Sequence, residues 1–319
     1  MLSRVAESIY WMSRYVERAE NVARCISVNL NLSLDLPGVA GDQWSPLVVT
    51  MGDADTFYES YSTPGRSNVI EFLTFDRSNP NSILSCLTSA RENARSVRES
   101  ISSEMWQHLN AFYLRVRDAR REEAFRDPHT YFDGITAAGQ QFVGVTDVTM
   151  THGEGWHFGQ LGRMIERADK TSRILDVKYF ILLPHITDVG TTYDNVQWLA
   201  LLRSASGLEM YRQAFGRIDP SGVVQFLILD RDFPRAVLHC LTRADKSLHE
   251  ITGTNVGGFS CPPEQLLGML RSKLAFTTAE KIIEGGLHEF VDDLQRRLNE
   301  VGGEIAREFF LLPLAASAT

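Results

Sequence analysis

SRYVERAENVARCI at residues 13–26 and GRMIERADKTSRIL at residues 162–175 decide how this chain is interpreted. The two segments align without a gap at a separation of 149 residues. Their identical positions carry mostly charged residues: Arg14, Glu17, Arg18, Ala19 and Arg24 recur as Arg163, Glu166, Arg167, Ala168 and Arg173. Self-similarity of this kind indicates an internal duplication.

A second pair of segments supports the duplication. FLTFDRSNPNSILSCLTSA at 72–90 and FLILDRDFPRAVLHCLTRA at 226–244 are identical at 10 of 19 positions and lie 154 residues apart. The two pairs occur in the same order, so one short insertion reconciles their separations. The sequence therefore predicts two repeats, 1–150 and 151–319. Since no Pro-, Gly- or Ser-rich linker separates them, we expect a single helical domain over 1–319.

Hydrophobic periodicity indicates helices. Apolar residues at positions 2 to 30 recur at spacings of three and four, the pattern of a long amphipathic helix. Further helices are predicted at about 80–103, 104–125, 264–270 and 279–310, with Pro80 and Pro234 in first helical turns. Strict alternation of apolar and polar residues is nearly absent. The predicted fold class is all-α, a pseudo-two-fold helical bundle made of two duplicated units.

Composition excludes several classes of function. The net charge of −8 and the pI near 5.5 argue against a nucleic-acid surface, which needs clustered Lys and Arg. No stretch approaches the length of an apolar membrane span, and the charged N-terminal segment is unlike a secretory signal. The four cysteines form no CxxC pair, which favours reduced thiols. We therefore expect a cytoplasmic protein without a membrane or nucleic-acid partner.

The repeated Glu-Arg motif is the most informative group of polar residues. On a helical wheel its charges lie opposite the main apolar stripe, but Tyr10 and Trp11 share their side, as Trp156 does in the second repeat. A helix that is apolar almost all round is usually covered on every side. The motif is therefore expected to be buried or to line a cleft.

Two interpretations of this cluster stand side by side. In the first, Glu17 pairs with Arg167 and Glu166 pairs with Arg18 across a pseudo-two-fold axis, because buried charges need partners. In the second, the two glutamates orient arginines around a pocket for a carboxylate or a phosphate. The arginines of that pocket would be Arg14, Arg18, Arg163 and Arg167.

No other constellation of residues predicts catalysis. The chain has no Ser-His-Asp set, P-loop, GxGxxG or HExxH motif that can be placed in a suitable context. Cys86 and Cys240 occupy equivalent core-facing positions, which favours burial over nucleophilic duty. We therefore predict no cofactor and no metal, and an enzyme is the less favoured interpretation.

The chain resembles a known bacterial family. LSRVAESIYWMSRYVERAENVAR at 2–24, the segment FDRSNPNSILSCLTSARENARSVRESIS from Phe75, and EGWHFGQLGRMIERADKTSRIL at 154–175 resemble the Alpha-E family, a predicted α-helical domain with a conserved Glu-Arg motif. The resemblance covers essentially the whole chain and places that motif on Glu17-Arg18 and Glu166-Arg167. It implies an association with a circularly permuted ATP-grasp ligase and a transglutaminase-like protease.

Two hypotheses about function follow. The first is a non-catalytic helical scaffold, or a substrate-holding partner, of the peptide ligase and the protease. The second is an enzyme whose cleft lies at the Glu-Arg motifs, where Glu17 or Glu166 acts as general base on an anionic peptide or amide. A self-associating helical protein is a third possibility. The substrate and the oligomeric state stay open at this point.

Overall fold

The computed structural model describes residues 1–35, 44–51, 54–180 and 192–311. Within these ranges the chain forms helices joined by turns and has no strand, which confirms the all-α class. The helices of the first half are α1 Ser3–Asp35, α2 Ser45–Met51, α3 Ala54–Ser60, α4 Arg66–Thr74, α5 Ile83–Ser96, α6 Ser103–Arg117, α7 Arg121–Arg126 and α8 Pro128–Thr149.

The second half continues from α9, and two of its segments have π-helical hydrogen bonding. Its elements are α9 Glu154–Phe180, α10 Thr192–Ser204, α11 Leu208–Phe215, α12 Pro220–Val224, the π-helix η2 Gln225–Leu229, α13 Val237–Thr252, α14 Pro262–Ala275, α15 Ala279–Glu284, α16 Leu287–Ile305 and the π-helix η3 Ala306–Phe310. None of the described helices is both long enough and apolar enough to cross a bilayer.

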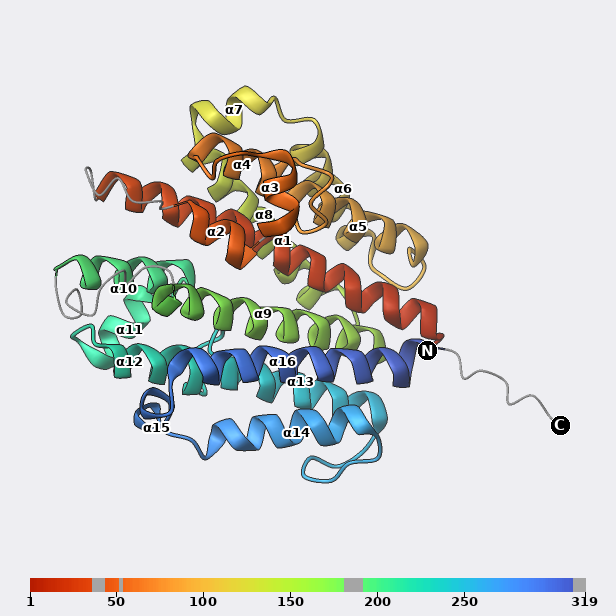
Figure 1. Ribbon diagram of the computed structural model, residues 1–319. Helices are drawn as coiled ribbons and strands as arrows, with labels where there is room; N and C mark the ends of the chain where they lie inside the picture. The colour runs from red at the N-terminus through yellow and green to blue at the C-terminus, as the bar shows by residue number, and fades with distance from the viewer. Residues whose placement is uncertain (36–43, 52–53, 181–191, 312–319) are drawn as a thin grey trace.

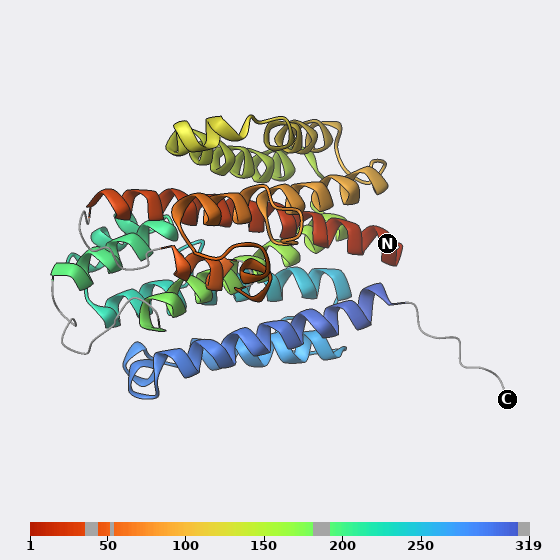
Figure 2. The same cartoon turned by 45° about the horizontal axis from the view of Figure 1, so that its top comes forward.

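The long helices pack as two four-helix bundles that share a central contact. In the first bundle α1 contacts α5 and α8, and α6 closes the ring by contacting both. In the second bundle α9 contacts α13 and α16, and α14 closes the ring. Figures 1 and 2 show α1 and α9 next to each other, with α5, α6 and α8 on one side and α13, α14 and α16 on the other. The boundary falls between α8 and α9, near the predicted repeat boundary, and the duplication itself stays a prediction.

The two central helices run in the same direction. The N-terminal ammonium of Met1 donates to Glu154 Oε2 at 2.7 Å, which joins the start of α1 to the start of α9. From Ala19 to Leu30 every residue of α1 is buried, as expected for a helix covered on all sides. The small residues Ser13, Gly159 and Gly162 lie where the helices cross. A Cβ atom on Gly162 would lie only 2.5 Å from the carbonyl oxygen of Tyr10, so only glycine allows this approach.

Several predicted helix boundaries are wrong, and turn residues explain why. Pro80 lies in a turn, not in a helix; α5 begins only at Ile83, because Ser82 caps it by accepting a hydrogen bond from the amide of Ser85. Pro234 likewise precedes α13. The predicted helix 279–310 is interrupted at Gly286, whose φ of 91° suits glycine and ends α15 before α16 starts.

Three predicted helices also differ in where they end or in their extent. The segment 80–103 contains α5, followed by a turn that leads to the start of α6. Ser102 caps α6, because its side chain accepts a hydrogen bond from the amide of Met105. The segment 104–125 is divided between α6 and α7 at residues 118–120. The predicted helix 264–270 is the middle of α14, which is longer at both ends.

Candidate functional site

The two Glu-Arg motifs meet at the centre of the molecule, where α1 contacts α9. The crossing at Ser13, Gly159 and Gly162 brings the next turn of each helix close to the other. Because the helices are parallel, Glu17 and Arg18 of α1 lie opposite Glu166 and Arg167 of α9. The local sequence thus positions the motifs: small residues set the helix separation, and charged residues follow within one turn.

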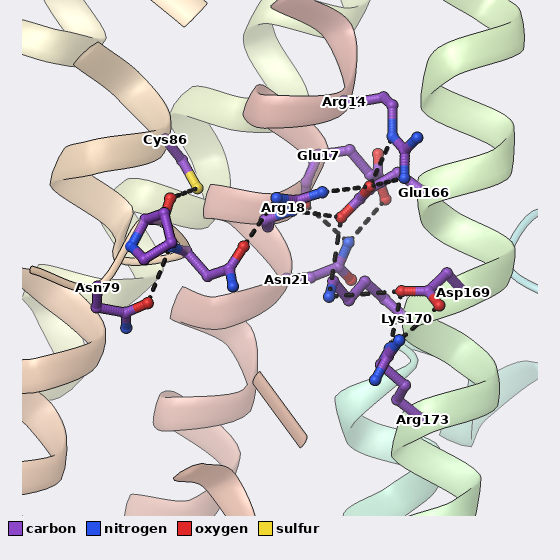
Figure 3. A network of polar contacts seen from close by, with 12 residues as sticks. Arg14, Glu17, Arg18, Asn21, Asn79, Cys86, Glu166, Asp169, Lys170 and Arg173 are labelled. Atoms are coloured by element: carbon purple, nitrogen blue, oxygen red, sulfur yellow. Dashed lines mark hydrogen bonds and ion pairs between the residues drawn. The ribbon is translucent and has the colours of Figure 1, made fainter. Parts of the chain in front are cut away.

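On one side of the contact, Glu166 is held by two arginines of α1 (Figure 3). Arg18 forms a fork, with Nε donating to Oε1 at 2.7 Å and Nη2 donating to Oε2 at 3.0 Å. The Nε atom of Arg14 donates to Oε2 at 2.9 Å. Lys170, one turn further along α9, places its ammonium 3.8 Å from Oε1. The remaining Nη1 of Arg18 donates to Asn81 Oδ1 at 2.8 Å.

On the other side, Glu17 is held by arginines of the second half. Arg167 forms the matching fork, with Nε to Oε1 at 2.9 Å and Nη2 to Oε2 at 2.8 Å. Arg235, which precedes α13, donates from Nη1 to Oε1 at 3.0 Å. Asn21 donates from Nδ2 to the same oxygen at 3.0 Å. The structure therefore contains both cross-pairs of the first interpretation, Glu17 with Arg167 and Glu166 with Arg18.

A cation and an amide exchange places between the two sides. At the separation of 149 residues Asn21 is equivalent to Lys170, and at the separation of 154 residues Asn81 is equivalent to Arg235. The Glu17 side therefore has its extra cation before α13, whereas the Glu166 side has it on α9. Among the described residues, Glu166 has three cationic partners, Arg14, Arg18 and Lys170, whereas Glu17 has two, Arg167 and Arg235.

Burial and charge set the protonation of both glutamates. The exposed fractions of Glu17 and Glu166 are 1% and 0%. Burial by itself would raise the pKa of Glu17, but the charges of Arg167 and Arg235 outweigh it and hold this pKa far below its ordinary range. Arg18 and Arg14 do the same for the pKa of Glu166. Both carboxylates are therefore ionised at neutral pH.

A second layer of charge extends the cluster by one helical turn. Glu20 accepts from Arg24 of its own helix and from Arg235 Nη2, the latter at 3.0 Å. The equivalent Asp169 accepts from Nε of Arg173 at 2.9 Å. Glu20 and Arg24 recur as Asp169 and Arg173 in the second segment, but the site predicted from the sequence does not include these four residues. The repeat does not predict a role for Arg235, because the equivalent residue in the first segment, Asn81, is an amide.

The whole cluster carries an excess of positive charge. Among the described residues its members are eight bases and five acids: Arg14, Arg18, Arg24, Arg163, Arg167, Lys170, Arg173 and Arg235 against Glu17, Glu20, Asp147, Glu166 and Asp169. The chain as a whole has a net charge of −8. The centre of an acidic protein is therefore locally basic.

The four arginines of the second interpretation do not surround one pocket. Arg14 and Arg18 are engaged by Glu166, and Arg167 is engaged by Glu17. Of the four, only Arg163 lines the cavity that the described residues form beside the motifs. Its Nη2 donates to Gln160, while its buried Nε has no hydrogen-bond partner within the described part of the chain.

The flanking aromatic residues also lie at the cluster, but in different ways. Tyr10 accepts a hydrogen bond from Arg14 Nη1 at 3.2 Å, and the Trp11 ring lies 4.8 Å from the guanidinium carbon of Arg14. Trp156 forms part of the cavity wall near Arg163 and stacks on His152 with ring centroids 4.2 Å apart. Within the described ranges, aromatic faces therefore cover the guanidinium of Arg14 but not that of its equivalent, Arg163.

Other candidates for chemistry are occupied or enclosed. All four cysteines are buried free thiols, and burial raises the pKa of Cys86 and of Cys240 to about 12. Within the described ranges no group of three or more His, Cys, Asp or Glu side chains is arranged to hold a metal ion.

Comparison with known proteins identifies relatives but no reaction. Residues 1–310 match the Alpha-E family profile, described as a predicted alpha-helical domain with a conserved ER motif. An uncharacterised protein of Mycobacterium bovis and two of Mycobacterium tuberculosis are each 22% identical to this chain over 306 residues. The match covers 88% of this chain but only 33% of each relative, so the chain spans about one third of their length. No solved structure matches the chain.

Proposed function

The chain belongs to the Alpha-E family, and from this premise we propose that it is a non-catalytic helical partner that holds a substrate for, or scaffolds, a peptide-forming enzyme system. A family described by its fold and its motif leaves the activity to be argued from the site. The observation that carries this proposal is the state of the two motif glutamates, because they are the groups that catalysis at the motif would need.

A general base must accept a proton near the working pH and must reach the substrate. Glu17 and Glu166 meet neither of these two requirements for a general base. Each already accepts hydrogen bonds on both of its oxygens from arginine, and its pKa lies far below neutral pH. The cavity beside them is about 20 Å³, room for about one water molecule. This geometry favours a structural cross-link between two bundles over a reaction chamber.

The relatives give independent support for a partner role. The helical unit accounts for about one third of each mycobacterial relative, so in those proteins it works within a longer chain. A helical unit whose described residues form no catalytic constellation, joined to further protein, suits an accessory module. We propose as partners the circularly permuted ATP-grasp ligase and the transglutaminase-like protease that the family resemblance implies.

The test combines the full chain with a purified circularly permuted ATP-grasp ligase, the proposed partner. Size-exclusion chromatography with light scattering should show a complex, and ligase-dependent ADP release should change several-fold when the chain is added. The chain alone should release no ADP and should not cleave or form amide bonds in the acceptor peptide. Turnover by the chain alone, abolished by Glu17→Gln in a folded variant, would instead establish the enzyme hypothesis.

A further inference from the structure

The helices that close the two bundles differ in the side that faces away from the molecule. Helix α6 contacts α5 and α8, and α14 contacts α13 and α16, so each lies at the outer edge of its bundle (Figure 1). The exposed residues of α6 include no large apolar side chain; they are Ser103, Glu104, Gln107, His108, Ala111, Arg115 and Arg117. A closing helix of this fold therefore needs no apolar outer face.

The outer face of α14 is apolar instead. Met269 is 60% exposed, and Phe276, which directly follows the helix, is 87% exposed. Pro262, the first residue of the helix, is exposed as well. These three residues follow one another at intervals of seven, which is almost two helical turns, so they lie on one line along α14. Exposed apolar side chains that gather in one place mark an interaction site.

The loop between α13 and α14 extends this apolar face, since it directly precedes Pro262. Val256 and Phe259 of the loop are 63% and 60% exposed. The buried carboxylate of Glu264 holds both ends of the loop, because it accepts hydrogen bonds from the hydroxyl of Thr252 and from the amide and hydroxyl of Ser260. Glu264 thus fixes the ends of a loop whose apolar side chains are left in solvent.

Charge favours a second copy of this chain as the occupant of the face. The protein has 40 acidic and 32 basic residues, so two copies carry the same net charge and repel each other. Residues 253–278 contain a single carboxylate, that of Glu264, which is 1% exposed. The two basic residues of this stretch form ion pairs within the chain, Arg271 with Asp245 and Lys273 with Asp293. Two copies of this face can therefore meet without opposing carboxylates.

The spacing of residues along α14 is symmetric about Met269. Pro262 and Phe276 each lie seven residues away, about 10 Å along the helix axis. When a second α14 packs antiparallel with a two-fold axis at Met269, each Phe276 meets Pro262 and the loop of the other copy. In the same register Lys273 lies opposite Gln265 of the second copy, so no like charges face each other. A contact between identical surfaces needs this self-complementarity, whereas a contact with a different protein does not.

We propose that the outer face of α14, with the loop before it, joins two copies of this chain into a symmetric dimer whose two-fold axis passes Met269. One helix and one loop of each copy form the contact. We expect it to be smaller than the usual interface of about 800 Å² per partner, with a dissociation constant on the order of 10 µM. The dimer goes beyond the proposed function and does not depend on the ligase.

Sedimentation equilibrium of the full chain measures this association. Between about 1 and 200 µM the average mass should rise from the monomer mass of 35.9 kDa towards twice that value. Met269→Lys places two ammonium groups at the two-fold axis and should weaken the association at least about tenfold. Phe276→Ser, which removes the apolar contact at each end, should weaken it as well. Both side chains are exposed, so circular dichroism should show unchanged helix content in the two variants.

Val148→Lys is the matched control for these two variants. Val148 is an exposed apolar residue of α8, a helix of the first bundle, and α14 belongs to the second. The same replacement of an apolar side chain by an ammonium group there should leave the association unchanged.

Cysteine cross-linking tests the register of the two helices. Met269→Cys should form a disulfide between two copies under mild oxidation, because the two side chains meet at the axis. Gln265→Cys by itself should not, since the two equivalent positions lie about 12 Å apart along the helices. An equimolar mixture of Gln265→Cys and Lys273→Cys should again form the disulfide. The wild-type chain, whose four free thiols are buried, gives the background.

Three results would overturn the proposal: a monomer mass at every concentration, an association that Met269→Lys and Phe276→Ser leave unchanged, or a disulfide that Gln265→Cys forms as readily as Met269→Cys. If the chain stays monomeric and Met269→Lys instead abolishes binding to the ATP-grasp ligase, the face belongs to the ligase. That outcome contradicts the dimer and supports the proposed function, so the two can fail separately.

Discussion

Glu17 of α1 and Arg167 of α9 face each other across the central helix pair and share two parallel hydrogen bonds, of 2.9 Å and 2.8 Å. Glu166 and Arg18 repeat the relationship in the opposite direction, with bonds of 2.7 Å and 3.0 Å. Each fork therefore links the first bundle to the second. Buried forks of this kind hold a geometry in place, and they become costly as soon as one partner is removed.

Replacing either motif glutamate should destabilise the protein strongly. Glu17→Gln leaves Arg167 without its carboxylate partner in a buried position and removes one of the two carboxylates that pair with Arg235. Glu166→Gln leaves Arg18 and Arg14 without their carboxylate partner. We expect each change to lower the free energy of unfolding by about 3–5 kcal/mol, measured by urea denaturation at pH 7.

Glu92→Gln is the matched control, because Glu92 is 46% exposed and its ion-pair partners in the described part of the chain are Arg91 and Arg95. It should change the free energy of unfolding by no more than about 0.5 kcal/mol. If the motif variants are as stable as this control, the charges are retained for binding or catalysis and not for folding.

The two glutamates should also make the stability fall in acid. Their pKa values are lower in the folded chain than the ordinary value of about 4.3 in an unfolded chain. Their contribution is therefore complete above about pH 5 and is lost progressively as the pH falls below the unfolded value towards the folded one. The difference in unfolding free energy between wild type and Glu17→Gln should narrow from pH 7 to pH 3. A constant difference over that range would contradict the assigned ionisation.

Around Glu17, replacing Arg235 by an amide should be better tolerated when Asn21 is replaced by a cation at the same time. Arg235→Asn removes a partner from Glu17 and should be destabilising by itself. Asn21→Lys should recover part of the loss, because it recreates around Glu17 the arrangement of Lys170 and Asn81 around Glu166. A double-mutant cycle should give a favourable coupling of about 1–2 kcal/mol. Strict additivity would show that the two sides are not interchangeable.

Much of the fold could be predicted from the sequence, because it rests on local patterns. Apolar spacing of three and four gives the helices, and the repeated Glu-Arg segment indicates which helices are central. The cross-pairs also follow from the need of buried charges for partners. The limits of the helices were less predictable. Helix α5 starts after its cap Ser82 and not at Pro80, and Gly286 ends a helix although the apolar spacing continues beyond it.

The details of the candidate site depend on tertiary contacts that no single segment shows. Arg235 is far in sequence from Glu17, and only the packing of α13 against α9 brings it there. The cavity at Arg163 is lined by residues of α1, α8 and α9, and no single segment of the sequence shows that these three helices meet there. The sequence placed four arginines at the site, but it did not show which of them lacks a carboxylate.

Three of the four cysteines, Cys25, Cys86 and Cys240, should be inert in the folded protein. Burial raises the pKa of Cys25 to about 11 and those of Cys86 and Cys240 to about 12, so the thiolate fraction at pH 8 is negligible. We expect no reaction of these three thiols with a disulfide reagent such as DTNB at pH 8, and full reaction in 6 M guanidinium chloride. Rapid modification of Cys86 or Cys240 in the native state would reopen the possibility of a cysteine nucleophile.

The crossing of α1 and α9 provides the sharpest test of the packing. Alanine is a better helix former than glycine by about 1 kcal/mol, so helix propensity alone predicts that a Gly-to-Ala change in α9 is stabilising. At Gly162, however, the new Cβ would lie 2.5 Å from the Tyr10 carbonyl oxygen, and backbone cannot move aside as a side chain can. Gly162→Ala should therefore lower the free energy of unfolding by about 1–3 kcal/mol by forcing the central helices apart.

Gly144→Ala is the matched control, because nothing lies within 4 Å of its Cβ position in α8, and it should stabilise the protein by about 0.5–1 kcal/mol. If the two changes alter the free energy of unfolding with opposite signs in urea denaturation, Gly162 sets the close approach of the two helices and thereby the facing of the two motifs. Equal stabilisation by both changes would mean that the helices are further apart than the 2.5 Å separation at Gly162 implies.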